Sequence, residues 1–243
     1  MTYTDVISEA VSGPKLRVVE TYVSYQGEGP NTSRPTVFVR FAGCNFKCPG
    51  WPCDTQHAID PKLFTKTQRV VDPLVLAQEV VELGVDNVCL TGGEVFLQNT
   101  EALKAFVSEV NSFANVECFT NGALWWDHNI VHLIGNFILD WKLPGSGEVY
   151  KDEAAFFSNL EKLNQEDAVK FTIKDRKDYV EAKRRYEEYV DVTRSGPRVY
   201  AGVVWGQELT TEQLCAWMIE DRLPWNLNVQ VHKYVWHPDK QGV

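Results

Sequence analysis

Short apolar segments alternate with amphipathic ones along most of the chain, and this alternation restricts the possible folds more than any other feature of the sequence. Segments rich in Val, Ile, Phe and Tyr are predicted to be strands, at 16–25, 36–41, 87–90, 116–119, 137–141, 168–173, 199–204 and 227–236. Segments with helical spacing or interleaved charges are predicted to be helices, at 72–83, 99–113, 152–163, 175–189 and 210–220. This alternation predicts a parallel sheet with crossover helices.

The length of the chain suits one α/β domain. A domain of 243 residues can bury a full core without dividing. No internal repeat or low-complexity linker interrupts the sequence, so we expect a single domain over residues 1–243, in which residues 1–15 form a loose leader.

The charge and hydropathy of the chain exclude several classes of protein. A net charge of −9 gives no electrostatic footprint for a phosphate backbone or an anionic membrane. The N-terminus lacks the pattern of a signal peptide, and no apolar run approaches the ~20 residues that cross a bilayer. We therefore expect a cytoplasmic protein that binds neither nucleic acid nor membranes.

Three cysteines on one short loop point to a metal centre. Cys44, Cys48 and Cys53 follow directly after the predicted strand 36–41. A [4Fe–4S] cluster held by three cysteines leaves one iron free to bind a small molecule. That arrangement suits S-adenosylmethionine (SAM), which such a cluster can cleave reductively to a radical.

A structural zinc site is the alternative for this loop. The three cysteines together with His57 would complete a Cys3His set, and spacing alone leaves iron–sulfur and zinc both open. A disulfide is disfavoured because nothing indicates an oxidising compartment. The remaining cysteines stand alone in apolar stretches and are expected to be small buried hydrophobic residues; they are Cys89, Cys118 and Cys215.

The unusual residues of the chain come just after predicted strands. Besides the cysteine loop, they are Gly92-Gly93-Glu94 after strand 87–90, Asn121 after strand 116–119 and Lys142 after strand 137–141. In parallel α/β folds the carboxyl ends of the strands face one side, where active sites assemble. A zinc knuckle needs no such set, so the pattern favours an enzyme.

At this point the sequence resembles the radical SAM superfamily and, more narrowly, the 7-carboxy-7-deazaguanine synthase family. The resemblance covers almost the whole chain. It is carried by Tyr25-Gln26-Gly27-Glu28-Gly29, Phe38-Val39-Arg40-Phe41-Ala42-Gly43-Cys44-Asn45, Cys53-Asp54-Thr55, Thr91-Gly92-Gly93-Glu94, Thr120-Asn121-Gly122 and Gln230-Val231-His232-Lys233-Tyr234.

The resemblance implies a fold and a reaction. The fold is a partial, incomplete TIM-like parallel β/α barrel of the radical SAM type. The reaction is a lyase step of queuosine-type biosynthesis, in which 6-carboxy-5,6,7,8-tetrahydropterin becomes 7-carboxy-7-deazaguanine with loss of ammonia. A [4Fe–4S] cluster, SAM and Mg2+ are implied as cofactors, and an external electron donor and a second copy of the chain, as a homodimer, are implied as partners.

The resemblance also assigns roles to matching residues, none of them as a catalytic acid or base. The cluster would be held by Cys44, Cys48 and Cys53, and Mg2+ by Thr55. SAM would contact Gly92, Gly93, Glu94, Asn121, Asp140 and Lys142, with Glu94 either ordering the loop or accepting the SAM ammonium. The pterin would contact Tyr25, Gln26, Gly27, Glu28, Arg40 and Thr91, with Arg40 on its carboxylate.

The chain departs from the family pattern at three places. Its second cysteine gap holds four residues, 49–52, where family members commonly have two. Val95 stands where a proline usually follows Gly-Gly-Glu, and Asp140-Trp141 where the family usually has Ser-Pro before the lysine. The main alternative within the superfamily is an activase that installs a glycyl radical on a partner protein, which would not need Gln26, Glu28 or Arg40 as ligands.

The block 232–236 is expected to pack and to position the C-terminus rather than to perform chemistry. A further hypothesis places the terminal carboxylate of Val243 in the pocket.

Overall fold

One open, mostly parallel sheet organises the molecule. The computed structural model describes residues 13–51, 53–192, 196–237, 240 and 242. Within them, a 9-stranded sheet has the order β3-β1-β2-β4-β5-β6-β7-β8-β9. The strands are β1 (Leu16–Tyr25), β2 (Pro35–Phe41), β3 (Arg69–Val71), β4 (Asn87–Gly92), β5 (Asn115–Thr120), β6 (Asn136–Asp140), β7 (Ala168–Ile173), β8 (Arg198–Val203) and β9 (Asn226–Leu227).

The strands from β2 to β9 are parallel, as the alternation predicts, but β1 is not. β1 pairs antiparallel with both β2 and β3. The reason is the connection between β1 and β2, because residues 26–34 contain no helix and are fewer than the dozen or so residues that a parallel crossover needs. The N-terminal part of the sheet is therefore a hairpin.

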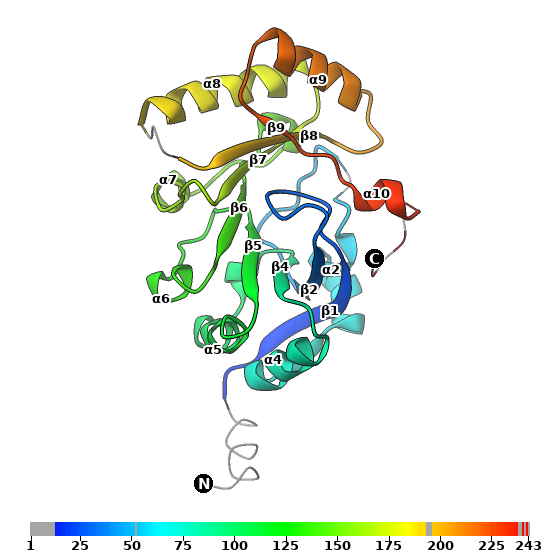
Figure 1. The fold of residues 1–243 in the computed structure, drawn as a ribbon, viewed down its shortest axis with the longest axis vertical. Coiled ribbons are helices and arrows are strands. Elements are labelled where there is room, and N and C mark those ends of the chain that lie inside the picture. Colours follow the sequence, from blue (N-terminus) through cyan, green and yellow to red (C-terminus); the bar gives the residue numbers. More distant parts are fainter. Residues whose placement is uncertain (1–12, 52, 193–195, 238–239, 241, 243) are drawn as a thin grey trace, which may run out of the picture.

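Helices follow most strands and cover one side of the sheet. Figure 1 shows α4 to α8 in succession along that side of the curved sheet, while the turn 26–34 and α10 lie on the opposite side. The helices are α2 (Gln56–Ile59), α3 (Pro61–Thr67), α4 (Pro73–Glu82), α5 (Thr100–Val110), α6 (His128–Val131), α7 (Glu153–Leu160), α8 (Arg176–Val192), α9 (Thr211–Glu220) and α10 (His232–Val235), with single 3-10 turns at Val95–Leu97 and Pro144–Ser146.

The long predicted helices begin at the capping residues that the sequence provides. The Asp72 side chain accepts from Leu74 N ahead of Pro73, and Thr210 forms a capping box with Gln213. The sequence did not indicate the short elements α2, α3, β3 and α6. They are a few residues long, so periodicity gives little signal for them.

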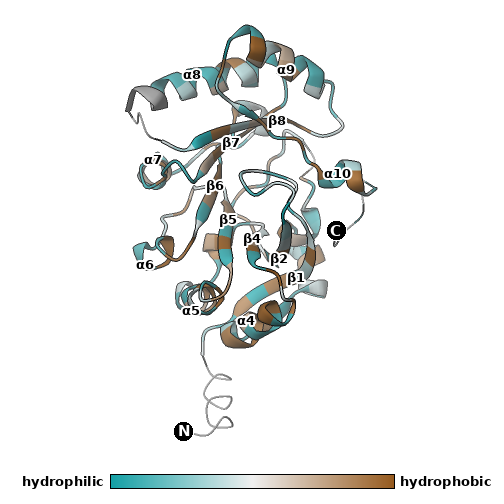
Figure 2. Ribbon diagram, viewed as in Figure 1, coloured by the Kyte–Doolittle hydropathy of each residue, from teal (hydrophilic) through white to brown (hydrophobic). Residues whose placement is uncertain are grey.

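The longer helices, such as α4 and α5, bury one face against the sheet. Leu76, Ala77 and Val80 of α4 are fully buried, whereas the hydrophilic residues of α8 run along most of its length in Figure 2. One cluster of buried apolar side chains extends from Leu16 in β1 to Trp225 before β9. This core fixes the strand ends that carry the polar residues.

The last predicted strand, 227–236, is wrong. The chain forms only β9 and then the short helix α10. Contacts with the turn 26–34 override the alternating pattern, because Asn228 Oδ1 accepts from Gly29 N and Val231 N donates to Gly27 O. These hydrogen bonds draw the chain away from the sheet and across its concave side.

The sheet does not close on itself, which confirms the predicted incomplete barrel. β3 and β9 form its two edges and do not pair with each other. Most of the predicted leader, 1–12, lies outside the described residues, and 13–15 lie in neither helix nor strand. No described helix combines the length and the apolar character required to span a membrane.

Candidate active site

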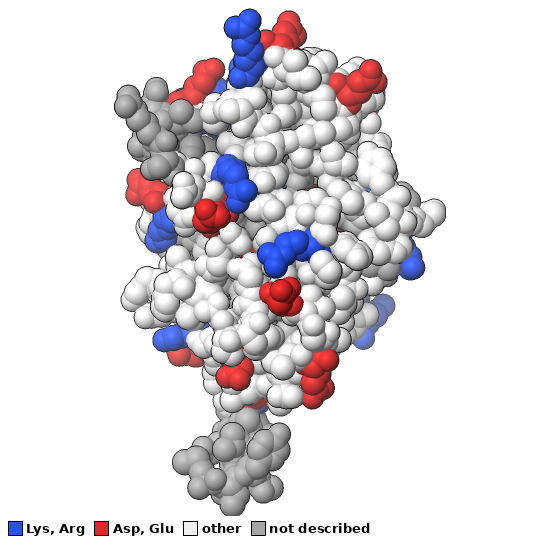
Figure 3. Space-filling view, viewed as in Figure 1, with Lys and Arg blue, Asp and Glu red and all other residues white. Residues whose placement is uncertain are grey.

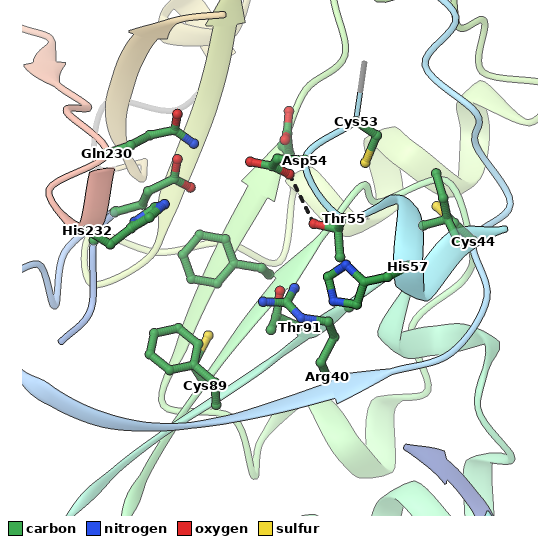
Figure 4. Close-up of a pocket in the computed structure, with 18 of the residues that line it drawn as sticks. Arg40, Cys44, Cys53, Asp54, Thr55, His57, Cys89, Thr91, Gln230 and His232 are labelled. Carbon is green, nitrogen blue, oxygen red and sulfur yellow. Dashed lines mark hydrogen bonds between the residues drawn. The ribbon is translucent and has the colours of Figure 1, made fainter. Parts of the chain in front are cut away.

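The predicted site residues come together in one place, where the carboxyl ends of β2, β4, β5 and β6 meet the end of β1 and the turn after it, which lie beside the amino end of β2. All of them except Glu94 line a single pocket: Tyr25, Gln26, Gly27, Glu28, Arg40, Cys44, Cys48, Cys53, Thr55, Thr91, Gly92, Gly93, Asn121, Asp140 and Lys142. In Figure 4, Cys44 and Cys53 lie on one side of this pocket and Gln230 and His232 on the other, with Arg40 and Thr91 between them. The pocket therefore has two sides. We call the side with Cys44 and Cys53 the sulfur side, and the side with Gln230 and His232 the polar side.

The start of the cysteine loop is fixed by its contacts with the end of β4. Gly93 N donates to Phe41 O, and Glu94 N donates to Gly43 O at 2.8 Å. A Cβ at Gly92, whose φ is +127°, would lie 2.2 Å from Phe41 O, so only glycine allows this approach. The glycine pair thus seats the cysteine loop, in addition to any ligand it could accommodate.

A methyl group at Gly93 is expected to displace the cysteine loop. Its Cβ would lie 1.9 Å from the carbonyl oxygen of Gly43. We expect Gly93→Ala to lower the free energy of unfolding by at least about 2 kcal/mol, measured by urea titration of the metal-free protein. Gly13→Ala is the control because nothing lies within 4 Å of its added Cβ. Equal stability of the two variants would contradict this role.

The three cysteine sulfurs share the pocket as protonated thiols. Burial raises the pKa of Cys44 to about 12 and that of Cys48 to about 11, and it also raises the pKa of Cys53. Among the described residues, no three His, Cys, Asp or Glu side chains already lie close enough to hold a metal ion. Three thiols on one loop are nevertheless the donors that an iron–sulfur cluster takes, and binding it would release their protons.

His57 does not join the cysteines. Its Nε2 lies 3.1 Å from Glu20 Oε1, and the same oxygen accepts from Arg40 Nε at 2.6 Å. The hydroxyl oxygen of Tyr22 accepts from Arg40 Nη2 at 3.0 Å. The fourth ligand of the zinc alternative is therefore engaged in an arginine–carboxylate cluster instead.

Arg40 is held ready on one wall of the pocket by this cluster. Burial by itself would raise the pKa of Glu20, but the hydrogen bond from His57 and the charge of Arg40 hold that pKa below its usual value. The Arg40 side chain is 14% exposed, and Nη1 has no partner among the described residues. A guanidinium in this state can receive an anionic group of a ligand.

Glu94 lies beneath the pocket and links two strand ends. Its carboxylate accepts from Thr120 Oγ1 at 2.7 Å and from Asn121 N at 2.8 Å. Asn121 Nδ2 in turn donates to Asn45 Oδ1 at 2.8 Å in the cysteine loop. Burial raises the pKa of Glu94 despite these hydrogen bonds. In this structure Glu94 therefore orders the loops after β4 and β5.

Four charged side chains that are largely shielded from solvent cross the floor of the pocket. Lys142 Nζ lies 2.9 Å from Asp140 Oδ2, and Lys170 Nζ lies 2.7 Å from Glu28 Oε2 and 3.8 Å from Asp140. Burial would raise the pKa of Asp140, but Lys142 and then Lys170 hold it below its usual value. The network balances two ammonium groups against two carboxylates.

Both the nitrogen and the oxygen of the Gln26 side-chain amide form hydrogen bonds within the protein. Its Nε2 donates to Glu117, and its Oε1 accepts from Gly27 N at 3.0 Å and from Glu28 N at 3.2 Å. Gln26 therefore shapes the turn that presents Glu28.

Thr55 lies at the start of α2, where its hydroxyl donates to Asp54 Oδ1 at 3.0 Å and lines the pocket.

Several residues of the site were not predicted. Lys170 and Glu117 each carry the one charge in an otherwise apolar strand segment, and that pattern was the available signal, because a buried charge needs a partner. His232 and Lys233 line the pocket from α10, although the block 232–236 was expected only to pack. Cys89 is buried and lines the pocket, Cys118 is buried, and Cys215, expected to be buried, is only half-buried. Val243 lies outside the described residues, while Lys240 and Gly242 line the pocket.

Comparisons with known proteins support an iron–sulfur cluster at the sulfur side of this pocket. The family described as "4Fe-4S single cluster domain" matches residues 25–129, which contain all three cysteines of the loop. The crystal structure of QueE from Escherichia coli has the same fold, with a TM-score of 0.67 at 17% identity over 88% of this chain and 92% of that one. The matched family and the three-cysteine loop together indicate a protein of the class that holds a single [4Fe–4S] cluster.

Relatives along the whole chain identify the family. The 7-carboxy-7-deazaguanine synthase of Clostridium acetobutylicum is 32% identical over 232 residues, which cover 93% of this chain and 99% of the relative. Those of Leptospira interrogans and Chlorobaculum tepidum are also 32% identical, each over 94% of this chain and over 98% and 97% of the relative. The chain belongs to the 7-carboxy-7-deazaguanine synthase family, as its motifs predict.

Proposed function

We propose that this protein converts 6-carboxy-5,6,7,8-tetrahydropterin to 7-carboxy-7-deazaguanine with loss of ammonia, using a [4Fe–4S] cluster, SAM and Mg2+. The observation that supports the proposal is that the residues to which the resemblance assigns the cluster, SAM and the substrate, except Glu94, line one pocket. When bound, the cluster supplies the electron that cleaves SAM to a radical, and the cofactors carry the hard chemistry.

The residues of the chain bind and orient the reactants. Cys44, Cys48 and Cys53 hold the cluster on the sulfur side. Asn121, reaching across to Asn45, and the Asp140–Lys142 pair supply polar groups beside it for the amino and carboxylate groups of SAM. Glu94 supports this side by ordering the loop that carries Asn121.

The polar side suits the pterin. Arg40 offers its outer N–H groups to the substrate carboxylate, and Glu28 lies at the turn that Gln26 shapes. The side chain of Glu28 is 12% exposed and paired with Lys170, so a ligand would exchange with or add to that pair. Thr55 supplies a single hydroxyl oxygen, which fits an Mg2+ that keeps water and substrate oxygens as its other ligands.

The partners follow from the family and stay predictions: an external electron donor, a homodimer and a cytoplasmic location. Binding of nucleic acid is not part of the proposal. On the face drawn in Figure 3, acidic and basic side chains are interspersed rather than gathered into one basic patch, which supports a small-molecule role.

The test is anaerobic purification with iron and sulfide analysis, followed by assay with SAM, dithionite, Mg2+ and the carboxytetrahydropterin. We expect about four irons per chain and formation of the carboxydeazaguanine. Cluster loading and SAM cleavage without that product would retain the superfamily and reject the substrate. Zinc in place of iron would reject the mechanism.

A further inference from the structure

The cysteine loop is fastened around its second cysteine by a later loop. Lys47 N and Cys48 N both donate to Glu148 Oε1, each at 2.6 Å. Gly50 N donates to Ser146 O at 2.9 Å. We call Glu148, the Ser146 carbonyl and Lys174, whose Nζ donates to Gly50 O at 2.8 Å, the clamp.

The fit between the two loops leaves no room for side chains at their contact. A Cβ on Gly50 would lie 1.8 Å from Gly145 O, and a Cβ on Gly147, whose φ is +75°, would lie 2.8 Å from Pro49 Cγ. Backbone therefore packs directly on backbone here. The two loops are therefore complementary in shape at this contact.

The loop that carries the clamp is itself rigidly supported. Asp178, 1% exposed, accepts from Gly145 N at 2.7 Å and from Lys174 N at 3.1 Å. Ser146 is fully buried, and its hydroxyl donates to Leu143 O at 2.7 Å and accepts from Glu148 N at 3.1 Å. The clamp therefore holds the cysteine loop in a fixed position relative to the ends of β6 and β7.

The backbone at Cys48 requires such support. Its φ is +46°, a left-handed conformation that is uncommon for a residue other than glycine and that persists only when the surroundings determine it. A carboxylate oxygen receiving two N–H groups is a strong, charge-assisted acceptor. Glu148 thus holds Cys48 and the residue before it in a conformation that the chain would otherwise leave.

We propose that Glu148 is a positioning residue for the cluster ligand Cys48, and that the clamp allows a second cysteine gap of four residues to serve a three-cysteine cluster. The proposal rests on the proposed function only in assuming that a cluster binds. A longer gap gives the loop more conformations, and the clamp removes them from the segment next to Cys48. Residues that form hydrogen bonds to metal ligands without touching the metal orient those ligands, and replacing one typically weakens metal binding about 10-fold or more.

The test compares Glu148→Ala with Glu148→Gln in the reconstituted protein. Iron and sulfide per chain and the rate of cluster loss to a chelator, followed by visible absorbance, are measured without turnover. We expect Glu148→Ala to lose the cluster about 10-fold faster. Glu148→Gln keeps an oxygen that accepts both N–H groups, so it should retain the cluster nearly as well as the wild type, with a raised reduction potential because a negative charge is gone. The control is Glu109→Ala, an exposed glutamate of α5.

Two results would overturn the proposal. Wild-type cluster retention in Glu148→Ala would show that the clamp is not needed, and equal loss in the alanine and glutamine variants would show that hydrogen bonding is not its basis. Should Glu148→Ala fail to fold, judged by thermal unfolding of the metal-free protein, Gly50→Ala and Lys174→Met test the same contact. Their controls are Gly13→Ala and Lys177→Met, and faster loss is expected only in the clamp variants.

The outcome is separable from that of the proposed function. A wild type that binds the cluster but makes no carboxydeazaguanine would reject the function, and the clamp would still be judged by cluster retention. A wild type that makes the product, beside a Glu148→Ala variant that retains its cluster fully, would reject the clamp alone.

Discussion

Replacing any one of Cys44, Cys48 or Cys53 by alanine is expected to reduce the iron content from about four atoms per chain to a small fraction of one, and to abolish product formation. Two remaining thiolates cannot hold a cluster that needs three protein ligands. Burial keeps these sulfurs protonated in the metal-free protein, so cluster binding has to displace their protons. Because of this cost, the cluster binds weakly once one of its ligands is lost.

The matched control for this experiment is Cys215→Ala. Cys215 is half-buried in α9 and does not line the pocket. Its variant should keep the brown colour, the iron content and the activity of the wild type. Full iron content in the Cys44, Cys48 or Cys53 variant would mean that another side chain replaces that thiolate, and the ligand assignment would be wrong.

Asp140→Asn is expected to lower the free energy of unfolding at pH 7 by about 3 kcal/mol, because it leaves Lys142 without its carboxylate partner in a buried site. The side chains of this pair are only 15% and 18% exposed, so water screens the charges weakly. Lys170 keeps Glu28 as its partner and should be affected less. Urea titration of the metal-free protein measures the effect.

The dependence of this effect on pH follows from the direction of the pKa shift. The folded protein holds the pKa of Asp140 below its unfolded value, so the ionised carboxylate contributes stability that is fully present at neutral pH and is lost as the pH falls through the acid range, below about 5. The difference between wild type and Asp140→Asn should therefore shrink at acid pH.

Two controls complete this experiment. Asp86→Asn, at a carboxylate whose side chain is 82% exposed, should change stability little at any pH. The double variant Asp140→Asn with Lys142→Met should be more stable than the sum of the two single losses predicts, since it removes both charges. Additive losses, or a difference that grows toward acid pH, would contradict the pairing.

The sequence predicted which residues meet in one pocket better than it predicted the two ends of the fold. The rule that carboxyl ends of parallel strands meet was enough to bring Cys44, Arg40, Gly93 and Lys142 together, because strand–helix periodicity is a local property of the sequence. The antiparallel β1 could have been recognised from the short connection 26–34. The strand expected over 227–236 could not, because hydrogen bonds to Gly27 and Gly29, distant in the sequence, decide its path.

Residues that act through others were the ones that the sequence concealed. Glu148 lies in an irregular segment just after the 3-10 turn Pro144–Ser146, and its two hydrogen bonds to the cysteine loop are what distinguish it. Lys170 interrupts an apolar strand and could have been noted as a buried charge. No local pattern, however, pairs it with Glu28, from which it is separated by most of the chain.

An incomplete barrel has two edges where backbone groups could recruit a strand from another molecule, and here the outermost strand at each edge is short. β3 contains three residues and β9 two, so each of these outermost strands offers few unpaired N–H and C=O groups of its own, while β3 pairs with β1 only over Leu16–Val18 and β9 with β8 only at Tyr200 and Ala201. Short edge strands are a common protection against edge-to-edge aggregation. The open architecture therefore gives reactants access to the inside of the sheet, while its two outermost strands themselves expose little template for the growth of cross-β assemblies.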